Sequence, residues 1–323
     1  MSWFPKYELK PIYKPFVQVI DFLGSIMFSP FKPKEKIINS DIKSILLIRL
    51  DNMGDVLTTT PAIRAIKKGF PNSKIDILIR PATKDLIKNH PAIDKVIEFD
   101  SPWLHRSGAL NILESFKAFK SNPIISQLRQ KHYDLAIEFH TDPRNLLLTY
   151  IIGAKRRLGH DVRGLGFLLT DVVPYKKWNH IIERNLLLPE YLDCKAKDKH
   201  TDLFLDKPSF TQADRWIEKN IRGQFICINP CTGRPNKFWL DQRWAQVADQ
   251  LIEKLGITVV FTGAKQDTDR INNIISQMKN RSSAKVAAGS LSLLASAALF
   301  KRSKLLLATD TGPLHIAKAM RTP

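Results

Sequence analysis

The sequence predicts an α/β protein with two parallel β-sheets, one in each half of the chain. Short apolar runs alternate with helical patterns over residues 41–99 and again from residue 224 onward. Such alternation is typical of the βαβ units that form parallel sheets. The length of 323 residues also allows two domains, at about 150 residues each.

In the first block, the apolar run Ile45–Leu50 has the length and branching of a buried parallel strand, and a helix is expected from residue 56 to 68. Further strands are expected at residues 74–79, 95–99 and 134–139, with a short helix at residues 83–89. In the second block, strands are expected at residues 225–229, 257–261, 284–287 and 304–308, and helices at residues 241–255, 266–278, 291–300 and 313–320.

The composition is that of a globular protein with a strong positive charge. Fifty Lys and Arg residues against 31 Asp and Glu residues give a net charge of +19. This excess favours polyanionic partners, such as anionic lipid, phosphorylated substrates or nucleic acid. No nucleic-acid-binding motif accompanies it, and we therefore expect no nucleic-acid partner. The three cysteines have neither zinc-site nor disulfide-framework spacing, which favours a reducing compartment.

The N-terminal 40 residues form an amphipathic extension. The segment from residue 16 to 28 is the most apolar stretch, but Gln18, Asp21 and Gly24 interrupt it, and it is too short to span a membrane. Aromatic residues and lysines around it favour a helix that lies on a membrane surface. A helix that packs on the body of the protein is the alternative.

The loop after the first strand is the first candidate for a site, because ligands of open α/β sheets bind beyond the carboxyl ends of the strands. Asp55 could accept a proton from a hydroxyl there, or it could simply cap the following helix. Asp51 and Asp142 are lesser candidates for the same base, and His140 could orient a substrate. The run of basic residues at 155–157 is either a solvated face or part of an acceptor site.

Two loops of the second block have the features of a phosphate site. Asp310, Thr311, Gly312 and His315 lie where a strand ends and a helix starts, and free N–H groups at a helix start bind anions. In the loop after residue 229, Thr232 and Gly233 offer donors and Lys237 a mobile cation for a leaving diphosphate. The alternative for residues 310–315 is an ordinary capped helix, and the alternative for Lys237 is a solvent-exposed lysine. P-loop, zincin, hydrolase and dinucleotide-binding motifs are missing from the sequence.

The chain resembles the heptosyltransferases of glycosyltransferase family 9. The resemblance rests on ILLIRLDNMGDVLTTTPAIRAIK from Ile45, NPCTGRPNKFW from Asn229 and ATDTGPLHIAKAM from Ala308, in this order and spacing. It implies a GT-B architecture, with two Rossmann-like domains facing each other across a cleft. It also implies transfer of heptose from ADP-heptose to the lipopolysaccharide inner core, with inversion at the anomeric carbon. The chain departs from the family in its long N-terminal extension and in ending where another strand is expected.

The resemblance also implies roles for residues and regions. The catalytic carboxylate falls on Asp55 and the phosphate-neutralising lysine on Lys237. The nucleotide-sugar site comprises Thr232, Gly233, Asp310, Thr311, Gly312 and His315. Apart from the resemblance, polar and basic residues of the first block are expected to form the acceptor site: Asn52, Met53, Gly54, His140, Arg144 and Arg163. Residues 41–178 form the acceptor domain, 179–223 a linker, and 224–323 an incomplete nucleotide-sugar domain.

The expected partners and location follow from this function. The ADP-sugar is a substrate, and neither a cofactor nor a metal is expected. The acceptor is a lipid-linked or phosphorylated glycan, and the protein is expected to be a monomer on the cytoplasmic face of the bacterial inner membrane. The sequence leaves two alternatives to this function. One is a family member with another nucleotide-sugar or acceptor, and the other is a non-catalytic basic α/β protein that binds membranes or nucleic acid.

Overall fold

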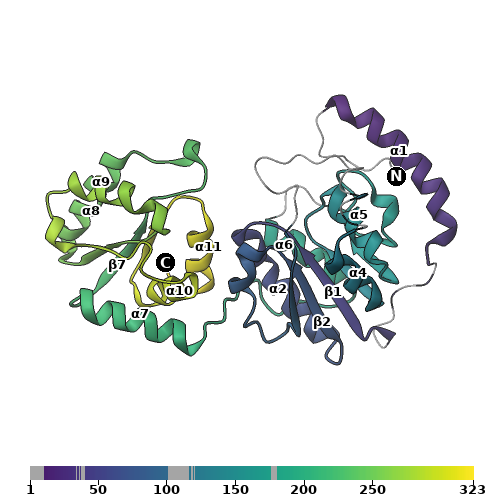
Figure 1. Ribbon diagram of the computed structural model, residues 1–323, viewed down its shortest axis with the longest axis horizontal. Helices are drawn as coiled ribbons and strands as arrows, with labels where there is room; N and C mark the ends of the chain where they lie inside the picture. Colours follow the sequence, from purple (N-terminus) through teal and green to yellow (C-terminus); the bar gives the residue numbers. More distant parts are fainter. Residues whose placement is uncertain are drawn as a thin grey trace. The chain divides into compact units, whose positions relative to one another are not determined.

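The structure is a computed structural model, and it describes residues 11–33, 35, 37, 41–100, 116–117, 119, 121–175 and 180–323. The chain divides into two compact units, Met1–His200 and Thr201–Pro323 (Figure 1). Each unit contains one parallel sheet with helices packed on it, so the predicted α/β class is confirmed.

The sheet of the first unit has six parallel strands in the order β3-β2-β1-β4-β5-β6. Their bounds are β1 Ser44–Arg49, β2 Lys74–Ile79, β3 Lys95–Glu98, β4 Leu135–Glu138, β5 Arg156–Gly159 and β6 Asp171–Val172. In the central register, Ile45 of β1 is paired with Ile75 on one side and with Leu135 on the other. The chain order therefore reverses between β1 and β4, which is the switch point where doubly wound sheets bind ligands.

In the part of the chain that the structure describes, five α-helices of the first unit accompany this sheet. Their bounds are α1 Lys14–Phe28, α2 Met53–Gly69, α4 Pro123–Gln130, α5 Pro143–Ile152 and α6 Ile181–Tyr191. Leu46, Ile48 and Leu50 form one buried cluster with residues of α4 and α5. On α2, Thr58 and Thr59 bind the side-chain amide of Asn185, which fixes α6 beside α2.

The second unit repeats the same strand order on a smaller scale. Its four parallel strands, β7 Phe225–Asn229, β8 Thr258–Phe261, β9 Ala284–Val286 and β10 Leu306–Ala308, follow the order β10-β7-β8-β9. Its helices are α7 Lys207–Asn220, α8 Asp241–Leu255, α9 Thr268–Ser276, α10 Leu293–Arg302 and α11 Gly312–Ala319. Ile226 and Ile228 of β7 pack against Trp244 of α8 and Ile271 of α9.

Three expectations for local structure were wrong. The short helix expected at residues 83–89 is a 3₁₀ segment, η4 Pro81–Leu86, which begins at the proline. The helix expected at residues 56–68 is α2, and it begins three residues earlier, at Met53. The basic run at 155–157 enters β5, where Arg156 binds the buried carboxylate of Asp171 with atoms 2.9 Å and 2.5 Å apart. That pairing neutralises Arg156, one of the three basic residues that were expected either on a solvated face or in an acceptor site.

Residues 179–223, expected to link the domains, contain two helices that belong to different units. Helix α6 lies in the first unit beside α2, and α7 lies in the second unit beside α10. Within the N-terminal extension, residues 1–10 lie outside the described residues, whereas residues 14–28 form α1. Among the described helices, none combines the length and the apolar character that crossing a membrane requires.

Candidate active site

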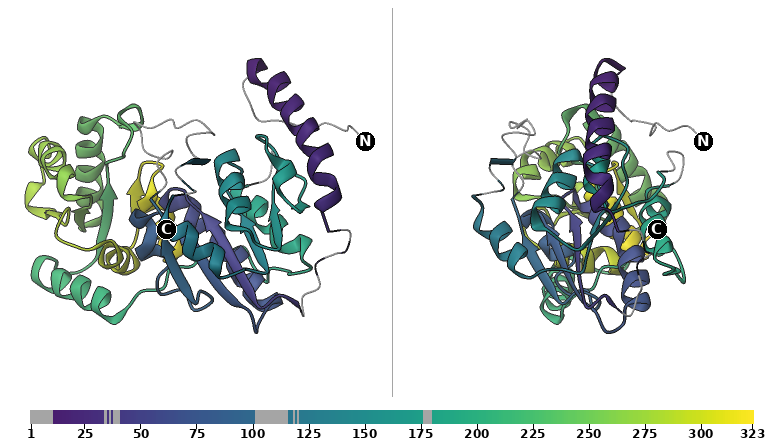
Figure 2. Two further views of the ribbon diagram at one scale, coloured as in Figure 1. Left: turned by 45° about the vertical axis from the view of Figure 1, so that its right-hand side comes forward. Right: turned by 90° about the vertical axis from the view of Figure 1, so that its right-hand side faces the viewer.

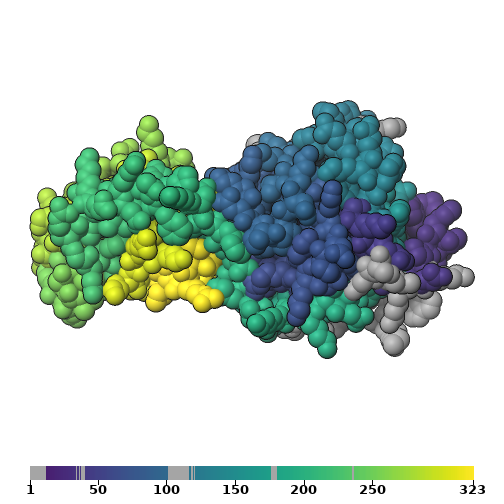
Figure 3. All heavy atoms as spheres, turned by 90° about the horizontal axis from the view of Figure 1, so that it is seen from below, coloured from purple at the N-terminus to yellow at the C-terminus, as the bar shows by residue number. Residues whose placement is uncertain are grey.

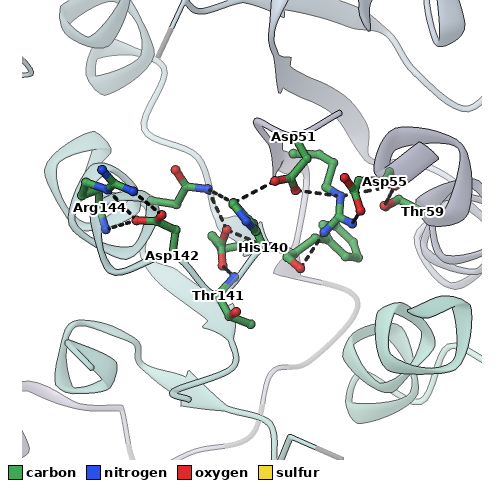
Figure 4. A network of polar contacts seen from close by, with 11 residues as sticks. Asp51, Asp55, Thr59, His140, Thr141, Asp142 and Arg144 are labelled. Atoms are coloured by element: carbon green, nitrogen blue, oxygen red, sulfur yellow. Dashed lines mark hydrogen bonds and ion pairs between the residues drawn. The ribbon is translucent and has the colours of Figure 1, made fainter. Parts of the chain in front are cut away.

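Two loops of the first unit meet at the reversal of strand order. One follows β1 and contains Asp51, with Asp55 in the first turn of α2 directly after it. The other follows β4 and contains His140 and Asp142. Because β1 and β4 are neighbours in the sheet, residues about 90 positions apart in the chain lie side by side there, as Arg49 and the carbonyl of Phe139 do. Figure 4 shows the resulting network of polar contacts.

Arg49 is the centre of this network. Its side chain is 2 % exposed, so its charge is removed from water and needs close partners. The guanidinium donates to the carbonyl of Phe139 at 2.7 Å and to the carbonyl of Asp55 at 3.3 Å. It also lies 3.2 Å from the Asp51 carboxylate and 3.6 Å from the Asp55 carboxylate. One buried cation therefore holds both acids of the first loop.

Asp55 is the accessible acid of this group. Its side chain is 38 % exposed, compared with 5 % for Asp51. It lies in the first turn of α2, where a negative charge interacts favourably with the helix dipole. The N-cap residue of α2 is Asn52, so the alternative interpretation of Asp55 as the helix cap is wrong. The position of Asp55 leaves its carboxylate able to meet a substrate.

The buried Asp51 and the half-buried His140 form an ion pair next to Arg49. Nδ1 of His140 lies 2.9 Å from Oδ1 of Asp51 (Figure 4). Burial opposes ionisation of Asp51, but Arg49, His140 and Arg163 outweigh it and hold the pKa of Asp51 below its ordinary value. Burial likewise opposes the charging of His140, but the hydrogen bond and charge of Asp51 raise the pKa of His140. Asp51 is thus paired with Arg49 and His140 inside the protein, and it is a poor candidate for the catalytic base.

The turn that carries His140 is held by Glu138, the last residue of β4. The fully buried carboxylate of Glu138 accepts hydrogen bonds from the backbone N–H groups of His140 and Thr141, each at 2.8 Å. Thr141 has a φ of 69°, in the left-handed region that residues with a side chain seldom adopt. Burial raises the pKa of Glu138, although these hydrogen bonds oppose the rise. This support fixes the direction of the His140 side chain.

The remaining acceptor-site candidates have different surroundings. Asp142 caps α5 and binds Arg144 through two contacts of 2.9 Å and 2.7 Å, so it is engaged as a structural residue. Arg163 is near enough to Asp51 to lower the pKa of that carboxyl. Asn52, Met53 and Gly54 form the start of α2 beside Asp55. The structure thus gathers the predicted acceptor residues around the carboxyl ends of β1 and β4.

In the second unit, the two predicted phosphate loops also meet at a reversal of strand order. They follow β7 and β10, which are neighbours in the sheet. Nζ of Lys237 lies 2.7 Å from the carboxylate of Asp310, and this hydrogen bond and charge lower the pKa of Asp310. The hydroxyl of Thr309 reaches the carbonyl of Cys231 at 3.4 Å. Lys237 is therefore not an isolated surface lysine.

The helix after β10 starts where the anion site was expected. Helix α11 begins at Gly312 with Thr311 as its N-cap, and no side chain caps it. Its first turn contains Pro313, and the charge of His315 further lowers the pKa of Asp310. Thr232 accepts a hydrogen bond from the N–H of Arg234, next to the exposed Gly233. The six predicted nucleotide-sugar residues thus lie on the two loops that Lys237 and Asp310 connect, or, for Gly312 and His315, in the first turn of α11 that follows one of them.

Sequence reasoning missed three residues of the first network: Arg49, Glu138 and Asn145. Arg49 and Glu138 are charged residues inside otherwise apolar strands, and a charge in such a run is the signal that could have identified them. Asn145 donates to Glu138 at 3.1 Å. Within the described part of the chain, His, Cys, Asp and Glu form no group that could hold a metal ion.

A family model described as glycosyltransferase family 9 (heptosyltransferase) matches residues 123–323, which is more than half of the chain. The chain belongs to glycosyltransferase family 9. It is therefore a glycosyltransferase, as the three motifs around Asp55, Lys237 and Asp310 predicted. A curated relative, lipopolysaccharide heptosyltransferase 3 of Escherichia coli, is 26 % identical over 282 residues, which cover 84 % of this chain and 78 % of the relative.

Solved structures of family 9 members have the same fold. The glycosyltransferase family 9 protein from Veillonella parvula matches with a TM-score of 0.74 and 23 % identity, over 86 % of this chain and 78 % of that one. ADP-heptose lipopolysaccharide heptosyltransferase II from Escherichia coli matches with a TM-score of 0.70 and 22 % identity, over 87 % and 83 % of the two chains. These matches confirm the predicted GT-B type of fold.

Proposed function

We propose that this glycosyltransferase moves a heptose from ADP-heptose to a hydroxyl group of a lipopolysaccharide inner-core acceptor, with inversion at the anomeric carbon. The names of the relatives support this donor and acceptor. The observation that carries the proposal is the difference between the acids at the switch point. Asp51 and Asp142 are buried and paired, whereas Asp55 keeps an exposed carboxylate beside the buried Arg49.

The reaction is a single displacement. Asp55 accepts the proton of the acceptor hydroxyl as the oxygen forms a bond to the anomeric carbon. The bond between that carbon and the β-phosphate oxygen breaks, and ADP leaves with the electron pair. Lys237, Thr232 and the first turn of α11 offset the charge that develops on the diphosphate. Lys237 is available for this role because its exposed pairing with Asp310 has little net energy, about 0–1 kcal/mol.

In this reaction, the acceptor binds at the loops after β1 and β4. His140 orients the acceptor sugar, and Arg144 and Arg163 provide positive charge for an acceptor that carries phosphate. The ADP-sugar is a substrate and not a cofactor, and Lys237 with the first turn of α11 takes the place of a metal ion in offsetting the diphosphate charge. Since such acceptors are lipid-linked, we propose that the protein acts on the inner face of the bacterial inner membrane. We propose that it acts there as a monomer.

A competition among donors tests this function. The chain is incubated with ADP-heptose and a panel of other nucleotide-sugars, each with and without a heptose-deficient lipopolysaccharide core. ADP-heptose should be consumed only with the acceptor, and mass spectrometry should show one added heptose. Proton NMR of the product then gives the anomeric configuration. Consumption of another donor in preference to ADP-heptose would assign a different substrate, and retention of configuration would exclude single displacement.

A further inference from the structure

Helix α1 has its polarity reversed relative to an ordinary surface helix. The residues that it turns toward the body of the first unit are mainly polar or small, with Asp21 8 % exposed and Gly24 buried. Lys14, Val17 and Gln18 share this stripe and are half-buried. A helix held on a globular body normally turns its apolar stripe inward. The side of α1 that faces the protein therefore buries few of the large apolar side chains of the helix.

Specific contacts fix this orientation of α1. The carboxylate of Asp21 accepts a hydrogen bond from the backbone N–H of Leu165 at 2.7 Å. A Cβ atom on Gly24 would come within 2.4 Å of the Phe167 ring, so glycine allows the helix to approach closely. At the end of α1, Phe28 packs against Tyr150 and Phe167, with ring centroids 5.6 Å and 5.2 Å away. The helix is thus docked through one defined face.

The opposite face of α1 exposes a continuous band of large apolar side chains. Phe16 is 69 % exposed and Ile26 is 60 % exposed. The band consists of Phe16, Val19, Ile20, Phe22, Leu23, Ile26 and Met27, all of them exposed. At 100° per residue, these positions share one side of the helix. Figure 2 shows α1 projecting beyond the rest of the first unit, and its purple atoms lie at the margin of the space-filling view (Figure 3).

We propose that α1 docks the enzyme on an anionic membrane surface, with this apolar band inserted among the lipid headgroups and upper acyl chains. The inference rests on the proposed function, because a lipid-linked acceptor lies in such a surface. Amphipathic helices bind interfaces in this way, and aromatic residues favour the headgroup region. A helix of 15 residues is about 22 Å long, enough to lie along the surface but too short to span it.

Charge favours lipid over a second copy of the chain as the occupant. The first 40 residues contain six lysines and three acidic residues, and the only acid in α1 is the buried Asp21. The apolar band therefore contains no negative charge, while lysines precede and follow it in the sequence. Anionic headgroups attract such a segment. Two identical α1 faces would instead bring like charges together, and the whole chain already carries +19.

Vesicle flotation tests the proposal with the whole chain. The vesicles contain either phosphatidylcholine alone or phosphatidylcholine with about one third phosphatidylglycerol, the anionic lipid. Ile26→Glu places a charge in the apolar band, and Leu255→Glu is the matched control, because Leu255 is 61 % exposed on α8 and Ile26 is 60 % exposed. The wild type and Leu255→Glu should float with anionic vesicles, and Ile26→Glu should bind about tenfold or more weakly.

Several results would overturn the inference. Equal flotation of Ile26→Glu and Leu255→Glu would show that α1 is not the docking element. A wild-type dimer that forms without lipid and that Ile26→Glu dissociates, measured by analytical ultracentrifugation, would assign the band to a second copy. The proposed function is measured separately, as heptose transfer to a detergent-solubilised acceptor. Transfer without flotation would reject only the docking of α1, and flotation without transfer would reject only the proposed reaction.

Discussion

Arg49, the last residue of β1, contacts Asp55 twice, with Nη2 3.6 Å from Oδ1 and Nε 3.3 Å from the backbone carbonyl of the same residue. Arg49 is buried and Asp55 is partly exposed. A rigid cation therefore sets the position of a reactive acid at the surface of the loop. We regard Arg49 as a positioning residue, because its contacts are with the protein.

Replacing Asp55 with Asn should lower kcat by about 10²–10⁴, because the amide cannot accept the hydroxyl proton, while ADP binding and stability stay near wild type. Asp142→Asn is the matched comparison at the neighbouring strand end. It should keep the cap of α5, because Asn caps helices as well as Asp does. It loses only the ion pair with Arg144 and should lose much less activity. Steady-state kinetics, calorimetry with ADP and urea unfolding measure these quantities. A kcat of Asp55→Asn near that of wild type would contradict the role of Asp55 as the base.

Arg49→Lys should lower kcat by about 100-fold, because a lysine keeps the charge but cannot hold Asp51, Asp55 and the Phe139 carbonyl together. The KM for ADP-heptose should change little, since the loops proposed to bind the donor belong to the second unit. Arg49→Met should instead lower stability by about 3–5 kcal/mol, because it leaves buried carboxylates without their cation. A fall in stability of Arg49→Lys that equals that of Arg49→Met would indicate a purely structural residue.

Lys237→Ala should weaken ADP binding by about 10- to 100-fold, the effect of one charge-assisted contact to phosphate. Lys254→Ala, an exposed lysine in the last turn of α8, is the control and should bind ADP like wild type. Isothermal titration calorimetry at low and high salt separates a specific contact from a general loss of positive charge. Equal ADP affinities of the two variants would remove Lys237 from the donor site.

The Asp51–His140 pair predicts a pH dependence of stability. The raised pKa of His140 stabilises the fold fully below the ordinary histidine value of about 6.5, and this contribution is lost as pH rises through the raised pKa. The lowered pKa of Asp51 stabilises the fold above about pH 3.9, and this contribution is lost as pH falls through the lowered pKa. Urea unfolding of wild type and His140→Gln should therefore differ most between about pH 4 and 6.5. A difference that grows above neutral pH would contradict the pairing.

The sequence predicted the central strands and the polar loops that follow them, because these depend on local patterns. Ile45–Leu50 is apolar and branched, and polar residues follow it directly. Asp55, Lys237 and Asp310 could be selected from such loops with the help of the family resemblance. The contact between Lys237 and Asp310 itself joins residues 73 positions apart and needs the order of the strands.

The elements that sequence reasoning missed depend on pairing. Strand β5 contains two arginines, and it is a strand only because Asp171 neutralises Arg156 and because Arg157 donates to the carbonyls of Leu168 and Ala154. The inward polarity of α1 likewise depends on the backbone N–H of Leu165, which lies 144 residues from Asp21. A pattern of residue types cannot identify a partner at that separation.

The strand order shared by the two sheets has a consequence for how such enzymes diverge. In each unit, the distance between the two functional loops is set by neighbouring strands, β1 and β4 or β7 and β10, and not by the chain that runs between them. Insertions and deletions in that intervening chain can therefore accumulate without separating the loops. Each unit has its own sheet and core. With the proposed acceptor site in the first unit and the proposed donor site in the second, substitutions that change acceptor recognition need not disturb donor recognition. The architecture thus allows one half of the specificity to evolve while the other is retained.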